Sequence, residues 1–115
     1  MPKLLMIDDD KSLMRLLSEY LVDQGFSVTC AENGRLGLRS LFESQPEIIL
    51  LDVTMPEKDG WETLERIREV SDKPVIMLTA RSDETDILKG FSLGADDFVT
   101  KPFSFAQLTA RIRAV

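Results

Sequence analysis

The sequence predicts an α/β domain with a doubly wound, five-stranded parallel sheet and five helices. Three runs of large apolar residues carry this prediction, at residues 4–7, 48–51 and 75–78. Continuous apolar runs of this length indicate strands buried on both faces, as in a parallel sheet covered by helices. Segments with helical periodicity separate the strands, which favours right-handed crossovers. A strand order of 2-1-3-4-5 would place the first and third strands side by side.

The first half of the chain is expected to contain two strands and two helices before the central strand. Residues 3–7 form the first strand, and Asp10 caps a helix over residues 11–24 that ends before Gly25. Apolar residues at spacings of three and four predict its inward stripe: Leu13, Leu16, Leu17, Tyr20 and Leu21. Residues 26–30 alternate apolar and polar positions, which is typical of an edge strand. A second helix then starts at Asn33-Gly34 and stops before Pro46, with Leu38, Leu41 and Phe42 inward.

The second half is expected to repeat the same alternation after the central strand. Asp59 and Glu62 form a capping pair for a helix whose inward residues are Trp61, Leu64, Ile67 and Val70. After the strand that follows Pro74, a short helix presents Ile87, Leu88 and Phe91 and ends at Gly94. Gly90 and Gly94 each lower helix stability by about 1 kcal/mol relative to alanine, so this helix is expected to be the weakest.

The last strand is predicted at residues 96–99, and the last helix opens on a capping box made by Ser104 and Gln107. Leu108, Ile112 and Val115 are its apolar residues. No C-cap glycine follows, so residues 1–115 are expected to be one domain at the N-terminal part of a longer protein.

Composition narrows the class of protein. With 43% hydrophobic and 30% charged residues, 115 residues fit one soluble domain. Apolar runs are shorter than a membrane span, and the first strand begins at Lys3, so we expect a cytoplasmic protein without a membrane partner. Cys30 is the single cysteine, which fits a reducing compartment. The net charge of -6 argues against direct DNA binding, and the lack of histidine excludes serine-histidine hydrolysis.

Polar residues follow the predicted strands where each strand ends, and these are the candidate site. Asp8 and Asp9 follow the first strand, while Asp52, Thr79 and Lys101 follow the third, fourth and fifth. At about 4 to 5 Å and an effective dielectric near 20, each pair of ionised carboxylates costs about 3 to 4 kcal/mol. A hard divalent cation such as Mg²⁺ offsets this repulsion, and it is typically held by one or two carboxylates together with phosphate oxygens. The alternative is that the acidic residues form only a solvated loop and a helix cap.

Two further features concern phosphate chemistry. Lys101 precedes Pro102, so a cis peptide bond is one option at this position and an ordinary trans loop is the other. The sequence contains neither a Walker motif nor a dinucleotide fingerprint, which excludes a nucleotide site of those kinds. The Thr79 hydroxyl is a candidate donor to a phosphoryl oxygen.

These residues resemble the receiver domain of two-component response regulators, over essentially the whole chain. The matching segments are Asp8-Asp9, residues 51–56 with Asp59-Gly60, residues 78–80, and residues 97–103. The resemblance implies a flavodoxin-like fold and a sensor histidine kinase as partner. It implies that Asp52 accepts the phosphoryl group from a kinase phosphohistidine.

The resemblance also implies roles for the other residues of the candidate site. Asp9, Asp52 and the backbone carbonyl of Thr54 would bind Mg²⁺ or Mn²⁺, with Asp8 acting partly through water. Thr79 and Lys101 would bind the phosphoryl group. Thr79 and Phe98 would form the switch, although Phe98 stands where the family often has tyrosine and lacks its hydroxyl. Thr54 and Arg81 stand at positions that modulate dephosphorylation in the family.

The final third is similar to the subfamily that carries a winged-helix DNA-binding output domain. In that subfamily the last two helices and last strand form a dimer face with ion pairs between subunits. The candidate charges here are Lys89, Asp96, Asp97, Arg111 and Arg113, while Ile87 and Gln107 replace one common pair. DNA binding would then come only from a missing output domain. A solvated charged face is the alternative.

Two other functions are alternatives to this interpretation of the sequence. A stand-alone receiver, or one attached to a hybrid kinase, would relay phosphate or bind a protein without DNA. A turnover phosphatase or a flavin enzyme would need a substrate pocket, and the sequence offers neither a phosphate-binding glycine loop nor a second catalytic acid.

Overall fold

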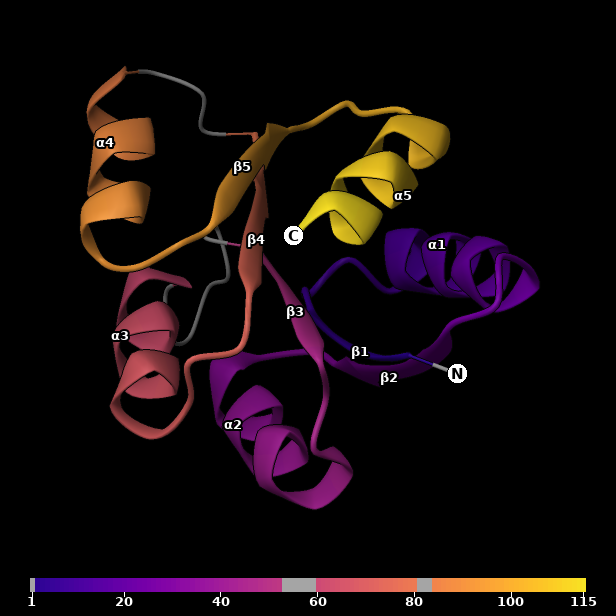
Figure 1. The fold of residues 1–115 in the computed structure, drawn as a ribbon, viewed down its shortest axis with the longest axis horizontal. Helices are drawn as coiled ribbons and strands as arrows, with labels where there is room; N and C mark the ends of the chain where they lie inside the picture. Colours follow the sequence, from indigo (N-terminus) through magenta and orange to yellow (C-terminus); the bar gives the residue numbers. More distant parts are fainter. Residues whose placement is uncertain (1, 53–59, 81–83) are drawn as a thin grey trace.

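The computed structural model describes residues 2–52, 60–80 and 84–115. These residues form three layers, with one parallel sheet between two layers of helices. Figure 1 shows α1 and α5 on one face of the sheet and α2, α3 and α4 on the other. The strands are β1 (Lys3–Ile7), β2 (Ser27–Ala31), β3 (Ile48–Asp52), β4 (Val75–Thr79) and β5 (Asp97–Thr100). The helices are α1 (Lys11–Asp23), α2 (Gly34–Ser44), α3 (Gly60–Val70), α4 (Glu84–Ser92) and α5 (Phe105–Ala114). The order β2-β1-β3-β4-β5 confirms the predicted topology.

Alternate residues of the central strands face opposite layers, which gives two apolar cores. Leu5, Ile49 and Met77 belong to the core beneath α2 and α3. Leu4, Leu50 and Ile76, each one position earlier or later, belong to the core beneath α1 and α5. Because both faces are covered, these runs have no polar alternation.

Three helices begin at the predicted caps. The side chain of Asp10 accepts a hydrogen bond from the Leu13 amide at 3.0 Å, and Asn33 and Ser104 cap α2 and α5 in the same way. Such caps satisfy amides that have no partner within the helix. At the other end of α1, Gly25 has a φ of 99°, a left-handed conformation that favours glycine. The sequence therefore predicted most helix ends closely, while the Asp59 cap lies outside the described residues.

Several predicted element boundaries are wrong by one residue, and some helix residues predicted to be buried are exposed. α1 ends at Asp23 rather than residue 24, while β2 and β5 each begin and end one residue later than predicted. Three residues expected to face inward are exposed, namely Leu16, Phe42 and Val70. Three further apolar helix residues are also exposed: Leu88, Phe91 and Val115. In α1 the buried positions are Met14, Leu17 and Leu21. Each helix contacts the sheet through a stripe narrower than its apolar composition indicates, so the outer apolar residues stay in solvent.

Within the described ranges, we find no helix with both the length and the apolar character needed to cross a membrane.

Candidate functional site

The candidate site lies where the parallel strands end, and strand register decides which side chains meet there. Ile7 of β1 pairs with Leu51 of β3, so the next residues, Asp8 and Asp52, stand side by side. Asp52 in turn pairs with Leu78 of β4, so Thr79 lies one position further along. The ends of the strands therefore step across the sheet, and their polar residues collect at one edge.

Three carboxylates converge at this edge. Asp8, Asp9 and Asp52 each offer one oxygen atom, and these atoms all lie within 4.8 Å of one another. The residues Asp8 and Asp52 are only 2% and 1% exposed, whereas Asp9 is open to solvent. Two buried carboxylates beside a third create a strongly negative cluster that is exposed to solvent at Asp9.

Lys101 supplies the positive charge that faces this cluster. Its Nζ lies 3.0 Å from Asp8 Oδ2 and 3.7 Å from Asp52 Oδ2. The backbone amide of Lys101 donates to the Thr79 carbonyl at 2.8 Å, which holds the lysine at the edge of the sheet. The peptide bond between Lys101 and Pro102 is cis, the first of the two options that the sequence left open.

Burial and charge shift two pKa values in the site. Burial raises the pKa of Asp8 to about 6, and the charge of Asp52 adds to this effect against the Asp10 amide and Lys101, which both lower it. Burial alone would lower the pKa of Lys101, but its hydrogen bond to Asp8 and the nearby carboxylates outweigh burial and raise it. Lys101 therefore stays charged at neutral pH, while Asp8 is easily protonated in mild acid.

The donor set fits a hard divalent cation. Mg²⁺ takes six oxygen ligands at about 2.0 to 2.1 Å, so neighbouring ligand oxygens are about 3 Å apart and opposite ones about 4 Å apart. The spacing of the three carboxylates is close to this range, and each can move by a side-chain rotation. The Thr54 carbonyl, the fourth predicted ligand, lies outside the described residues, as does Arg81.

The two predicted switch residues lie behind this edge. Thr79 is fully buried at the end of β4. Phe98 of β5 pairs with Met77 of β4 and packs, partly buried, against the core that contains Trp61. Phe98 therefore lies on the strand next to that of Thr79, two register positions before it.

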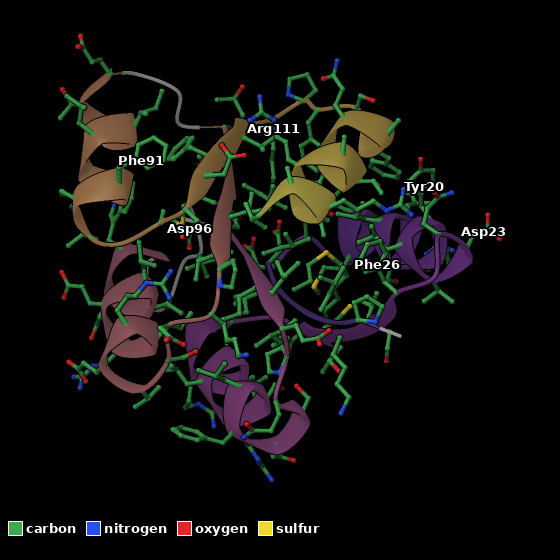
Figure 2. All side chains as sticks on the ribbon, in the orientation of Figure 1. Tyr20, Asp23, Phe26, Phe91, Asp96 and Arg111 are labelled. Carbon is green, nitrogen blue, oxygen red and sulfur yellow. The ribbon has the colours of Figure 1, made fainter. Side chains whose placement is uncertain are left out.

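The charges predicted for a dimer face have partners within the chain. Asp96 accepts from Arg68 at 2.8 Å and from the Val75 amide at 2.9 Å. Asp97 pairs with Arg111 at 3.0 Å, and Figure 2 shows Arg111 on α5 and Phe91 on α4, the helices that flank β5.

Two other charges of the predicted face lie against aromatic rings. The Lys89 ammonium lies 5.0 Å from the centre of the Trp61 ring. Arg113 instead donates to the Gln24 carbonyl at 3.1 Å and lies over Phe26, against the end of α1. The structure thus does not bring Arg113 together with the other four.

Arg68 was not predicted as important, yet it ties several segments together. Its guanidinium donates to the carbonyls of Ser71, Lys73 and Gly94 as well as to Asp96. One signal in the sequence could have pointed to Arg68: it is a basic residue in the last turn of a helix, where a positive charge interacts favourably with the helix dipole. Partners 26 and 28 residues further along the chain cannot be inferred from local spacing.

Comparisons with known proteins support one family. The family model described as "Response regulator receiver domain" matches residues 4–113. The transcriptional regulatory protein CpxR of Escherichia coli K12 is 47% identical over all 115 residues, and a CpxR homolog of Haemophilus influenzae is 50% identical. The chain spans about half the length of these curated relatives, at 49% and 50%.

Solved structures show the same architecture. A two-component response regulator from Clostridium difficile has a TM-score of 0.96 at 29% identity, covering 99% of this chain and 94% of that one. The BeF3-activated receiver domain of RstA from Klebsiella pneumoniae has a TM-score of 0.93 at 26% identity, covering 97% and 96%. The chemotaxis protein CheY4 of Vibrio cholerae has a TM-score of 0.95 at 30% identity, covering 100% and 98%. These similarities confirm the predicted fold and the predicted family.

Proposed function

Because this chain belongs to the response regulator receiver domain family, we propose that it accepts a phosphoryl group on Asp52 and switches an output domain in response. The observation that carries the proposal is the convergence of Asp8, Asp9 and Asp52 beside Lys101 at one edge of the sheet. Isolated acidic residues are common on protein surfaces. Burying two carboxylates beside one lysine costs free energy through charge repulsion and loss of hydration. A role in phosphoryl transfer would explain why the protein has such a cluster.

Asp52 is the proposed nucleophile because its buried carboxylate belongs to the cluster and stands where the family has its phosphoacceptor. One of its oxygens attacks the phosphorus of a phosphohistidine on a sensor histidine kinase. The P–O bond to Asp52 forms as the P–N bond to the histidine breaks, and the imidazole leaves with the electron pair. Asp8, Asp9 and Asp52 would hold Mg²⁺ or Mn²⁺, with Thr54 completing the set. A bound divalent cation neutralises charge on the phosphoryl oxygens during the transfer.

Lys101 and Thr79 are proposed to bind the phosphoryl group after the transfer. The Lys101 ammonium already lies 3.7 Å from Asp52 Oδ2 and is charged at neutral pH. A phosphoryl oxygen on Asp52 would compete with Asp8 for this ammonium. Thr79 lies at the end of the neighbouring strand, one register position beyond Asp52. Its hydroxyl would donate to a second phosphoryl oxygen, and Phe98 would then follow the movement of Thr79.

The output is proposed to be transcription. The relatives named above are transcriptional regulatory proteins about twice the length of this chain, which fits a DNA-binding domain, of the winged-helix kind, outside residues 1–115. The net charge of -6 leaves DNA contacts to that domain. We place the protein in the cytoplasm, where its kinase partner would present the phosphohistidine. It is a switch and not a turnover enzyme.

Dimerisation through α4, β5 and α5 upon phosphorylation is part of the same proposal. Leu88 and Phe91 of α4 are exposed apolar residues, and α4 packs against β5. Pairing between subunits would require Asp96 and Asp97 to exchange or share their present partners, Arg68 and Arg111. Arg113, against the end of α1, is the weakest member of the predicted face.

Incubation with Mg²⁺ and a small phosphodonor such as acetyl phosphate tests the assignment of Asp52. Intact mass measurement should show one added phosphoryl group on the wild-type chain and none on Asp52→Ala. The matched control is Asp72→Ala, which removes an exposed carboxylate outside the cluster and should be phosphorylated as the wild type is. Equal labelling of Asp52→Ala would refute the assignment.

A further inference from the structure

α4 rests on two aromatic rings through a residue without a side chain. Gly90 is the buried residue of this helix, while Leu88 and Phe91 on either side are exposed. A β-carbon placed on Gly90 would lie 3.2 and 3.3 Å from two ring carbons of Phe98 and 3.4 Å from one ring carbon of Trp61. Ordinary carbon contacts are about 3.5 to 4.0 Å. The backbone of α4 therefore lies as close to the rings as glycine allows.

Trp61, the first of the two rings, is firmly held. It lies in the first turn of α3, is 5% exposed and belongs to the core beneath α2 and α3. The Lys89 ammonium lies 5.0 Å from its ring centre, a cation-π contact that joins α4 to α3. Trp61 is thus a fixed wall beneath α4.

Phe98, the second ring, belongs to the switch predicted from the sequence. It is partly buried against the same core. The family resemblance implies that an aromatic residue at this position turns inward when the domain is phosphorylated. Its backbone lies beside Met77, two residues before Thr79 on β4. Movement of β4 can therefore reach Phe98 through the neighbouring strand, and the Phe98 ring lies against α4 at Gly90.

The C-terminal end of α4 is fastened, so the helix cannot simply lift away from the rings. The Gly90 carbonyl accepts from the Ala95 amide at 3.0 Å, and the Gly94 amide donates to the Phe91 carbonyl at 3.1 Å, the two bonds of a Schellman motif. The Gly94 carbonyl in turn accepts from Arg68 Nε at 2.9 Å. A methyl group at position 90 must therefore be relieved mainly by displacing the Phe98 ring.

We propose that Gly90 is a positioning residue of the switch: it forms the seat that holds the Phe98 ring inward against Trp61 and transmits the position of that ring to α4. The proposal rests on the function proposed for Asp52. Gly90 and Trp61 would act by holding the Phe98 ring. Neither residue would act through helix propensity or by direct contact with the phosphoryl group. The seat favours glycine because a β-carbon at this position would crowd the Phe98 ring, which would have to shift by a few tenths of an ångström.

The test compares beryllofluoride affinity in the wild-type chain and in Gly90→Ala, with Mg²⁺ present and fluorine NMR as the readout. If the inward ring and the bound phosphoryl analogue favour each other, crowding the seat must weaken analogue binding, because coupling is reciprocal. We expect Gly90→Ala to weaken beryllofluoride binding by about fivefold or more, which is the size of a typical coupling between two sites. The affinity for Mg²⁺ alone should stay unchanged, because Gly90 touches none of the three carboxylates.

A second variant shows whether the effect acts through the ring. In the Phe98→Leu background, Gly90→Ala should change beryllofluoride affinity by less than about twofold, since the ring that it crowds is gone. Thr85→Ala, an exposed position on α4, is the control for helix propensity and should leave the affinity unchanged. Circular dichroism of each variant reports folding, and Phe98→Leu with glycine retained gives a readout even if Gly90→Ala unfolds, since it should also weaken the analogue.

The outcomes separate this inference from the proposed function. If the wild-type chain binds no beryllofluoride, the function proposed for Asp52 fails. If the wild type binds it and Gly90→Ala binds it equally well or better, the seat is refuted. An equal loss of affinity with phenylalanine or leucine at position 98 would also refute it, because the effect would then not pass through the ring.

Discussion

The strand ends around Asp52 and the α4–β5 region are built very differently. Within the described residues, β3 and β4 are almost wholly buried, whereas β5 is only partly buried along its length. α3 buries five residues against the sheet, and α4 buries only Gly90. The region that would accept phosphate is thus part of the core, while the region that would respond lies at its margin. Marginal segments open at low free energy, which is what a responsive element requires.

The largest contrast is expected from truncating one leucine in each region. Leu51→Ala leaves a cavity in the core at the fully buried residue that precedes Asp52, and should lower the free energy of unfolding by about 2 to 5 kcal/mol. Leu88→Ala, on the outer face of α4, should change it by less than about 0.5 kcal/mol. Urea denaturation followed by circular dichroism measures both. Similar losses would remove the distinction between core and margin.

Magnesium should stabilise the first region in a pH-dependent manner. The pKa of Asp8 is raised to about 6, so the folded chain holds this proton more tightly than the unfolded chain. Its contribution to stability is present in acid and is lost as the pH rises through about 6. Proton and metal compete for the same carboxylate, so the metal binds better above that pH.

Thermal unfolding with and without Mg²⁺ measures this effect. At 100 times the dissociation constant, the metal should add about 2.7 kcal/mol near neutral pH and much less below about pH 5. Asp8→Asn serves as the control and should flatten the pH dependence. Hydrogen exchange in α4 should change little, since the metal alone leaves Gly90 and Phe98 untouched. An equal gain at both pH values would contradict the role of Asp8.

Arg68 sharpens the comparison because it fastens the margin to the core. Arg68→Ala removes four donated hydrogen bonds, one of them charged at both ends, and should cost about 2 kcal/mol. Arg39→Ala removes an exposed pair with Glu43 and should cost only about 0.3 to 0.5 kcal/mol. Hydrogen exchange should speed up around Gly94 and Asp96 in the first variant alone. Faster exchange spread over β1 and β3 would show that Arg68 supports the whole fold.

Two glycines at helix ends give the smallest expected difference. Gly25 and Gly94 both have positive φ, 99° and 108°, so alanine is strained at either position. A β-carbon at Gly25 would meet nothing within 4 Å, but one at Gly94 would lie 2.9 Å from Arg68 Nε. Gly94→Ala should therefore cost about 1 kcal/mol more than Gly25→Ala in thermal unfolding. The difference should vanish in the Arg68→Ala background.

The predictions that failed are those that depend on packing between distant elements. Strand positions, three helix caps and the α1 end at Gly25 depend on interactions within a few residues, so they were predicted almost to the residue. Which side of each helix faces inward depends on how neighbouring helices cover the sheet. Leu16, Phe42 and Leu88 fit an apolar stripe by spacing, yet no second layer covers them.

The sequence by itself determined the residues at the strand ends, because a buried parallel strand is visible as an unbroken apolar run and its first polar residue marks the edge of the sheet. The alternation of strands and helices predicted the strand order, and the motifs at the strand ends predicted the family. Only the tertiary structure decided the partners of those residues. Register set the contact of Lys101 with Asp8 and Asp52, and helix packing set Arg68 against Gly94 and Gly90 against Phe98. Such contacts join residues far apart in the chain, whose distance depends on every element packed between them.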